Sequence, residues 1–290
     1  MTIKDHADKG LFRNQTHGSR KTTMKLSSEL KKKYLTLQHI LRGYGRLAIA
    51  FSGGVDSSLL LKIAHDTLGE NILALFADSV VQSEDERQSA IDTARALGTS
   101  LEIVAFTPLS LPDFVANTKT RCYHCKKSIF SAFIELASQR GFPLLADGTN
   151  VDDLSQDRPG AVAVAELGVK SPLAESGLTK GEIRQLSKTL ELPTWKKPSA
   201  SCLATRIPTG IPITAVDLTL VDKAERYLHG LGYHGCRVRL AGTTCYLEVV
   251  TGDIARLASR GELGVVHSYL CALGATKVFL DLLERESILS

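Results

Sequence analysis

The chain has 290 residues, of which 43% are apolar and 23% are charged, so it can bury one large core or two smaller ones. No stretch reaches the roughly eighteen uncharged apolar residues that a membrane-spanning helix needs, and the polar N-terminus lacks the apolar core of a signal peptide. We therefore expect a two-domain cytoplasmic protein without a membrane partner.

The formal net charge of +4 originates at the N-terminal end of the chain. Residues 1–33 hold nine Lys or Arg against three Asp or Glu, so the rest of the chain sums to −2. A basic segment on a near-neutral body is typical of a flexible solubilising arm, and contact with tRNA or another polyanion is the alternative. We expect residues 1–25 to be a disordered basic tail and assign no nucleic-acid partner to them.

Hydrophobic periodicity in the first half of the chain predicts alternating helices and strands. Apolar residues recur at helical spacing over 26–41, behind the potential caps Ser27 and Ser28. The strands predicted after this helix are 47–51, 72–77, 101–106 and 143–147, and the helices are 57–68, 83–97 and 124–140. This alternation predicts a doubly wound parallel sheet of the α/β class.

The second half begins where prolines interrupt regular structure. Thr179 and Glu182 form a capping box that opens a helix ending near Leu190, and four prolines follow between residues 193 and 212. We therefore predict a first domain at 26–195, a linker at 196–213 and a small α+β domain at 214–290. The elements predicted for this last domain are helices at 214–231 and 253–273 and strands at 237–240, 246–250 and 277–282.

A glycine-containing loop lies between the first predicted strand and the following helix. It reads Ser52, Gly53, Gly54, Val55, Asp56, Ser57 and Ser58. Backbone N–H groups at the positive end of a helix make such a loop an anion site. The Gly-Lys-Ser/Thr ending of the Walker loop is missing, so no lysine of the motif reaches the terminal phosphates. The SGGxDS pattern instead resembles the PP-loop of the AMP-forming ATP pyrophosphatase superfamily.

This resemblance implies that ATP, with Mg2+, occupies the loop and that a substrate oxygen attacks the α-phosphate. It also implies that the end of the second strand, Ala77, Asp78 and Ser79, lies near the adenosine. Asp147, Gly148 and Thr149 follow another strand, at the edge of the sheet where such folds bind ligands.

Six cysteines in a chain of cytosol-like composition predict thiols, metal ligation or catalysis, and not disulfides. Cys122 and Cys125 form a CxxC pair ahead of a predicted helix, a placement that lowers the pKa of a thiol. Cys202, followed by Arg206, lies among small polar residues that suit an exposed reactive thiol. His124 is too close to serve easily as a further zinc ligand, whereas three thiolates can hold a [4Fe-4S] cluster by three irons. The other cysteines suit small buried positions: Cys236, Cys245 and Cys271.

Several stretches together resemble the LarE family of ATP-dependent sacrificial sulfur transferases. They are the SGGxDS loop, RCYHC at 121–125, DGTN at 147–150, RPG at 158–160, SPL at 171–173 and CLATRIP at 202–208. The resemblance covers about residues 30–255. It implies that ATP adenylates a carboxylate of pyridinium-3,5-biscarboxylic acid mononucleotide and that sulfur then displaces AMP. Two rounds yield the bis-thiocarboxylate precursor of the nickel-pincer nucleotide of lactate racemase.

The resemblance also implies the source of the sulfur. In single-cysteine members of the family, the residue that matches Cys202 gives up its own sulfur and becomes dehydroalanine. Cys122 and Cys125 accompany it here, which resembles the members that bind a [4Fe-4S] cluster and pass on a cluster-bound sulfide. The family further implies a small-molecule nucleotide substrate and a homo-oligomer.

The C-terminal region carries further residues to which the resemblance assigns roles. Arginines that match substrate-phosphate contacts are Arg206, Arg237 and Arg239, and the last two alternate along one predicted strand and so share a face. Glu225 and Asp253 match carboxylates associated with metal, with a solvated helix surface as the alternative. Where the family shows Ala-Arg-Ile-Glu-Val, this chain has Cys-Tyr-Leu-Glu-Val at 245–249, so one arginine contact is missing.

Three other functions remain open from the sequence. An amidating ligase of the same superfamily, such as an NAD or GMP synthetase, would use ammonia and need no cysteine. A tRNA thiolase would use the CxxC pair and the basic tail. A zinc-stapled nucleotide sensor would hold one zinc ion and release no pyrophosphate.

Overall fold

The computed structural model describes residues 26–155, 159–198, 201–259 and 261–282. The predicted basic tail, Arg158 and Ser199 lie outside these residues. A four-stranded parallel sheet, in the order β3-β2-β1-β4, forms the centre of the first half of the chain. Its strands are β1 (Leu47–Ala50), β2 (Ile72–Asp78), β3 (Leu101–Ala105) and β4 (Leu145–Ala146).

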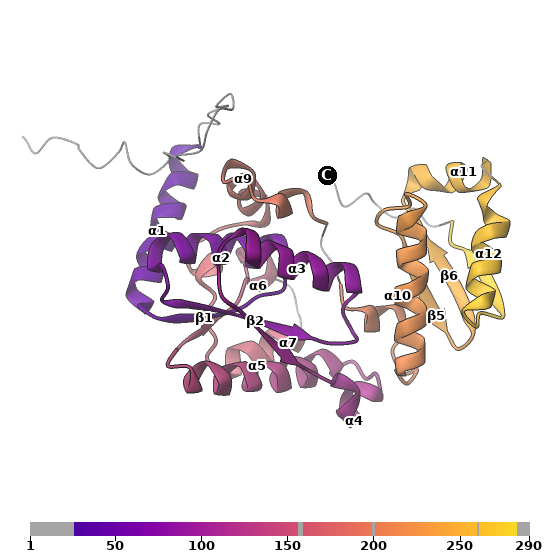
Figure 1. The fold of residues 1–290 in the computed structure, drawn as a ribbon, viewed down its shortest axis with the longest axis horizontal. Coiled ribbons are helices and arrows are strands. Elements are labelled where there is room, and N and C mark those ends of the chain that lie inside the picture. Colours follow the sequence, from indigo (N-terminus) through magenta and orange to yellow (C-terminus); the bar gives the residue numbers. More distant parts are fainter. Residues whose placement is uncertain (1–25, 156–158, 199–200, 260, 283–290) are drawn as a thin grey trace, which may run out of the picture.

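Helices cover both faces of this sheet (Figure 1). One face carries α1 (Ser28–Tyr44), α2 (Val55–Leu68), α3 (Glu84–Ala96) and α9 (Lys180–Thr189), and the other carries α5 (Arg121–Gln139) and α7 (Pro159–Glu166). Separate apolar cores fill the two layers because alternate residues of a strand point to opposite faces, as Ala48 and Ile49 of β1 do. The predicted doubly wound α/β architecture is confirmed.

Local capping explains where three of these helices begin. Ser27 accepts a hydrogen bond from the Leu30 N–H at 3.1 Å, and Ser83 accepts one from the Glu86 N–H at 3.2 Å. Thr179 starts α9 through the predicted reciprocal capping box with Glu182. Short helical turns fill the connections: η1 (Pro108–Ser110), α4 (Pro112–Val115), α6 (Val151–Leu154), α8 (Pro172–Glu175), η2 (Pro193–Lys196) and η3 (Leu203–Arg206).

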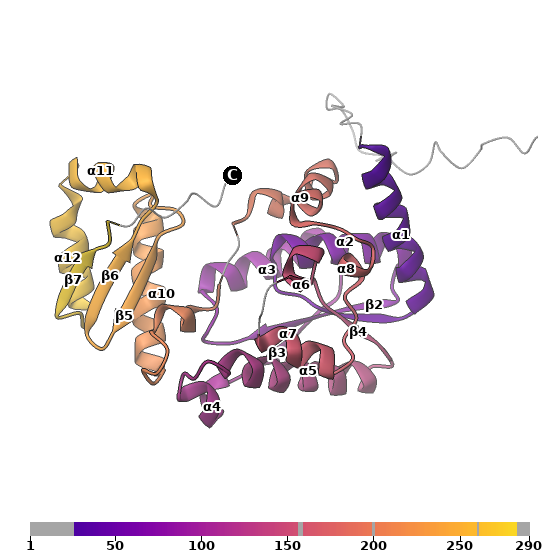
Figure 2. The same cartoon turned by 180° about the vertical axis from the view of Figure 1, so that it is seen from behind.

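A second, smaller sheet follows α10 (Ala215–Gly230) (Figure 2). In it, β5 (Arg237–Ala241) pairs antiparallel with β6 (Thr244–Glu248), which pairs parallel with β7 (Lys277–Leu280). The single helix predicted over 253–273 is wrong, because the chain forms α11 (Thr251–Ser259) and α12 (Glu262–Ala272). Gly261 lies between them at φ +66°, a left-handed conformation that no helix can continue through.

The two halves share an apolar contact beneath the predicted linker. Val81 and Phe114, from the first half, belong to the same buried cluster as Leu203 and Ile207. The Leu203 N–H donates to the Val81 carbonyl at 2.8 Å, so the segment after Cys202 is bonded to the turn that follows β2. Within the described ranges, no helix is long and apolar enough to cross a membrane.

Candidate active site

The predicted phosphate loop connects β1 to α2. The Ser52 and Ser57 hydroxyls lie 3.1 Å apart, and the Ser57 hydroxyl donates to the Gly54 carbonyl at 3.3 Å. Helix α2 begins at Val55, two residues earlier than predicted, and its N-cap residue Gly54 offers no side-chain acceptor. The first N–H groups of α2 therefore lack the usual side-chain cap, which suits them to an anion.

Two glycines hold the backbone close around this loop. Gly53 has φ +69°, and a Cβ there would lie 2.6 Å from the Ala90 Cβ. A Cβ at Gly148 would lie 3.0 Å from the Ser57 backbone nitrogen, directly over the loop. Only glycine fits these two places, because α3 packs against the loop at Gly53 and the DGTN turn packs against the start of α2 at Gly148. The roles of the loop residues in binding ATP stay predictions.

The other predicted nucleotide-site residues take different positions around the loop. Ser58 is fully buried and its N–H is bonded to the Gly54 carbonyl, so its hydroxyl does not face the loop opening. Ala77 and Asp78 end β2, which pairs directly with β1, and Asp78 accepts a hydrogen bond from Arg87 Nε at 2.9 Å. Ser79 follows, half-buried, and the roles of these residues stay predictions.

The DGTN turn closes the loop from the other side. Asp147, at the end of β4, is buried and accepts hydrogen bonds from the Thr149 hydroxyl at 2.6 Å and from the Ser171 hydroxyl at 2.8 Å. Because β4 pairs with β1, Gly148 and Thr149 lie at the same sheet edge as the loop. The hydrogen bonds to Asp147 thus hold the turn in shape, while Gly148 lies against the backbone at the start of α2.

Two lysines from later parts of the chain approach the loop, and neither was predicted. Lys180, the first residue of α9, forms an ion pair with Asp56, whose other oxygen accepts a hydrogen bond from Asn150 at 3.4 Å. Lys197 donates to the Gly53 carbonyl at 3.0 Å. The loop motif contains no lysine, but tertiary contacts supply two.

The CxxC pair was predicted to lie ahead of a helix, but it lies inside α5. Helix α5 begins at Arg121, so Cys122 and Cys125 are in its first turns, where residues three apart share one face. Cys122 is exposed, Cys125 is half-buried against the cluster that includes Leu203, and Cys202 is exposed just before η3. All three are free thiols.

The electrostatics of these thiols correct the expectation of low pKa values. Burial, together with the charges of the Cys202 and Cys122 thiols, raises the pKa of Cys125 to about 12. Close packing around Cys202 raises its pKa to about 11, although part of the side chain reaches solvent. Desolvation therefore raises the pKa of these thiols by more than the helix N-terminus lowers it. Cys122 and Cys202 thus lie within electrostatic reach of Cys125.

Their arrangement is nevertheless not a finished ligand set. Among the residues the structure describes, no three His, Cys, Asp or Glu side chains are placed to hold a metal ion. The donor set fits a cluster in its chemistry, because three free thiols, two from α5 and one from the linker, can act as thiolate ligands. Holding a cluster would require the Cys202 segment and the start of α5 to adjust.

Asn117 fixes the linker against the start of α5. It is fully buried at φ +52°, a conformation that asparagine tolerates better than most residues. Its side-chain amide nitrogen donates to the backbone carbonyls of Pro208 at 2.9 Å and Ile211 at 2.8 Å. The backbone carbonyl of Asn117 accepts a hydrogen bond from the Gly210 N–H at 2.9 Å. Arg121 donates to its side-chain oxygen. This one residue therefore connects the two cysteine-bearing segments.

Replacing Asn117 with alanine is expected to lower the free energy of unfolding by about 3 kcal/mol or more. The change leaves two partly buried carbonyls without their donor, at about 1–3 kcal/mol for each group, and replaces asparagine at positive φ by a residue that tolerates this conformation less well. Urea unfolding measures the loss. Asn117→Gly isolates the amide contribution because glycine tolerates the backbone conformation, and Thr118→Ala, at an exposed neighbour, is the control. An alanine variant as stable as the natural protein would contradict this role.

Arg206 and Glu225 bind each other in the interior. Their side chains are each 8% exposed, and two hydrogen bonds of 2.8 and 2.9 Å join the guanidinium to the carboxylate. Arg206 also donates to the Ser201 hydroxyl at 2.7 Å, and Glu225 accepts from the Val238 N–H at 2.9 Å. The alternative of a solvated surface for Glu225 is wrong. The predicted phosphate and metal roles of this pair would require it to open.

The remaining predicted residues lie on and beside the small sheet. Arg237 and Arg239 share one face of β5, as their alternation predicted. Arg239 pairs with Glu248 and donates to the Thr205 carbonyl at 3.1 Å, so it touches the segment after Cys202. Asp253 is bonded to a neighbouring arginine of α11 at 3.0 Å. The phosphate and metal roles of these residues stay predictions.

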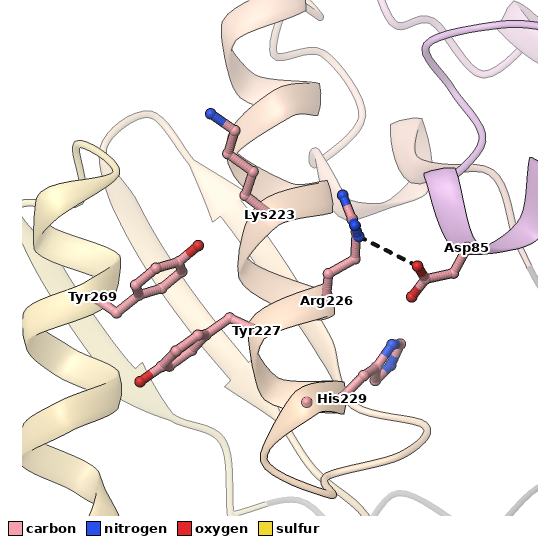
Figure 3. A pocket seen from close by; sticks show the side chains of 7 residues that line it. Asp85, Lys223, Arg226, Tyr227, His229 and Tyr269 are labelled. Atoms are coloured by element: carbon pink, nitrogen blue, oxygen red, sulfur yellow. Dashed lines mark ion pairs between the residues drawn. The ribbon is translucent and has the colours of Figure 1, made fainter.

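A separate hollow of about 540 Å³ lies beside α10 and is also lined by Asp85 of α3 and Tyr269 of α12 (Figure 3). Arg226 reaches from α10 to Asp85 at the start of α3, at 3.3 Å, while Tyr227 stacks on Tyr269 of α12 with ring centroids 3.8 Å apart. None of the predicted site residues lines it. The Arg226–Asp85 pair is an ionic contact between the two halves of the protein.

Comparison with known proteins finds relatives that cover most of the chain. The family described as NAD synthase matches residues 29–124. The chain is 38% identical over 253 residues to an uncharacterized protein of Synechocystis sp., covering 87% of this chain and 94% of that protein. It is 32% identical over 254 residues to pyridinium-3,5-bisthiocarboxylic acid mononucleotide synthase of Lactiplantibacillus plantarum, covering 87% and 91%. One component of the glutamine-hydrolyzing GMP synthase from Methanococcus maripaludis is 27% identical over 51% of each chain.

Proposed function

Because the chain belongs to the LarE family, within the PP-loop ATP pyrophosphatases, we propose that it converts carboxylates of pyridinium-3,5-biscarboxylic acid mononucleotide to thiocarboxylates. This sulfur transfer would serve the biosynthesis of the nickel-pincer nucleotide that activates lactate racemase. The observation that carries the proposal is the position of Cys202. The residue after it, Leu203, is bonded to Val81 in the turn that follows β2, and Lys197 of the same linker is bonded to the phosphate loop.

The first step in this proposal is adenylation. A carboxylate oxygen of the substrate attacks the α-phosphorus of ATP, the bond between the α-phosphorus and the bridging oxygen breaks, and pyrophosphate leaves with the electron pair. The uncapped N–H groups at the start of α2 would bind the pyrophosphate. The carboxylate of Asp56 is the group that would hold Mg2+, with Lys180 and Asn150 fixing its orientation.

The second step transfers sulfur. A sulfur nucleophile attacks the carbonyl carbon of the acyl-adenylate, and the bond to the phosphate oxygen breaks to release AMP. Arg206, bound to Glu225 and to Ser201, holds the start of the Cys202 segment in place. Cys122, Cys125 and Cys202 would hold a [4Fe-4S] cluster, which would carry a sulfide taken up from solution and so permit repeated turnover. Without the cluster, the Cys202 sulfur itself would attack the carbonyl carbon, and its Cβ–Sγ bond would then break with loss of the α-proton, leaving dehydroalanine after one transfer.

Anaerobically purified protein tests the proposal directly. With ATP, Mg2+ and the pyridinium substrate, we expect AMP and pyrophosphate in equal amounts and a thiocarboxylate product, detected by mass spectrometry. Iron and acid-labile sulfide of about four each per chain would support the cluster. Dehydroalanine at position 202, with one sulfur transferred per chain, would identify the sacrificial route instead. Stoichiometric zinc in active protein would exclude the cluster, and an amide product would exclude sulfur transfer.

The second candidate is an amidating ligase, which the NAD synthase match favours. That match covers the phosphate loop and Cys122 but ends before Cys125 and Cys202. It therefore concerns the nucleotide half of the site, which ligases and sulfur transferases have in common. The thiols outside the match favour sulfur transfer.

A further inference from the structure

Lys197 is the basic side chain at the phosphate loop that no carboxylate neutralises directly. Its ammonium group donates to the Gly53 carbonyl at 3.0 Å and to the Ser89 hydroxyl at 3.1 Å. Both of these partners are uncharged. Lys180, by contrast, is ion-paired with Asp56. Within the described part of the chain, no Asp or Glu oxygen lies within ion-pair distance of Lys197.

The surroundings of Lys197 make an anionic partner favourable. The side chain is half-buried between the loop and α3, and burial lowers the pKa of its ammonium group while Glu86 acts in the opposite direction. A desolvated cation with only neutral hydrogen-bond partners is costly, and a nearby anion reduces that cost. The uncapped first turn of α2, which suits an anion, begins two residues after Gly53.

We propose that Lys197 binds the β- and γ-phosphates of ATP, and so supplies from the linker the cation that the loop motif lacks. The inference rests on the proposed function, because it requires ATP at the loop. The flexible lysine side chain would exchange the Gly53 carbonyl for phosphate oxygens. It would stay protonated and stabilise the negative charge that gathers on pyrophosphate when the bond from the α-phosphorus breaks.

The inference predicts a selective loss of phosphate binding, which calorimetry on the full chain can measure. Lys197→Gln removes the charge but keeps an N–H donor for the Gly53 carbonyl. We expect it to weaken Mg-ATP and pyrophosphate binding about 10- to 100-fold, the usual effect of losing a hydrogen bond to a charged group. AMP lacks both distal phosphates, so its affinity should stay within about twofold. Lys197→Arg should recover much of the loss.

Lys196 provides the matched control. It is the adjacent lysine, it is exposed, and its ammonium group lies 4.8 Å from the centre of the Trp195 ring. Lys196→Gln should leave the affinities for ATP, pyrophosphate and AMP unchanged. Equal weakening of ATP and AMP by Lys197→Gln would overturn the inference, because it would indicate a structural contact only. Unchanged ATP binding would overturn it as well.

The wild-type measurement separates this inference from the proposed function. If the natural chain binds neither ATP nor pyrophosphate, the proposed function fails, and the role of Lys197 fails with it. If the natural chain binds ATP and Lys197→Gln binds it equally well, only the role of Lys197 fails. Equal thermal unfolding of the two proteins shows that the comparison concerns binding and not folding.

Discussion

Replacing Cys202 with alanine is expected to lower thiocarboxylate formation at least about 1,000-fold, a loss typical of removing a nucleophile. Pyrophosphate release in the first turnover should persist, because the phosphate loop lies on a different segment and contacts the linker through Lys197. The variant should fold normally, since the Cys202 side chain is exposed and substitutions at exposed positions usually change stability by less than about 0.5 kcal/mol.

The measurement compares pyrophosphate and thiocarboxylate in single-turnover reactions of the natural chain and the variant. Cys271→Ala is the matched control, because Cys271 is also a free, partly exposed thiol but lies on α12 beside His267. It should retain full activity. Unaltered product formation by Cys202→Ala would refute sulfur transfer through this residue and leave the amidating ligase as the better explanation.

The sheet and most of its helices could be predicted because their signals are local. The apolar residues of α1 recur at helical spacing, and Thr179 and Glu182 specify the start of α9 within four residues of sequence. The division of the C-terminal helix was missed because the periodic pattern continues across Gly261. Only its backbone conformation, at φ +66°, shows that the helix must end there.

Those parts of the candidate site that are formed by contiguous sequence motifs could be predicted. The phosphate loop and the CxxC pair are such motifs. The structure places the loop between β1 and α2 as expected, whereas the CxxC pair lies inside α5 and not ahead of it. Lys197 and Asn117 could not be found in this way, because their partners are 144 and up to 94 residues away in the chain. The thiol pKa values were misjudged for the same reason. The helix start is visible in the sequence, but the burial that outweighs it is not.

The buried pair formed by Arg206 and Glu225 leads to the largest expected change in stability. Glu225→Leu would leave the Arg206 guanidinium, 8% exposed, without its counter-charge. Breaking a buried ion pair on one side costs about 3–5 kcal/mol. For a domain of this size, the midpoint of thermal unfolding should then fall by about 6–20 °C. The double variant Arg206→Met with Glu225→Leu should recover part of the loss, because no uncompensated charge remains.

Thermal unfolding with Mg2+ and with a chelator separates this structural role from the predicted metal role. If Glu225 acts through Arg206, the loss in Glu225→Leu is the same under both conditions. If it is a metal ligand, Mg2+ stabilises the natural chain and this gain disappears in the variant. Asp92→Asn is the control, since Asp92 has no predicted metal role and pairs with an arginine three residues away at the surface of α3, a contact worth about 1 kcal/mol or less. A Glu225→Leu protein as stable as the Asp92→Asn protein would show that the pair does not hold the Cys202 segment. In that case its two residues would be free to bind substrate phosphate and metal.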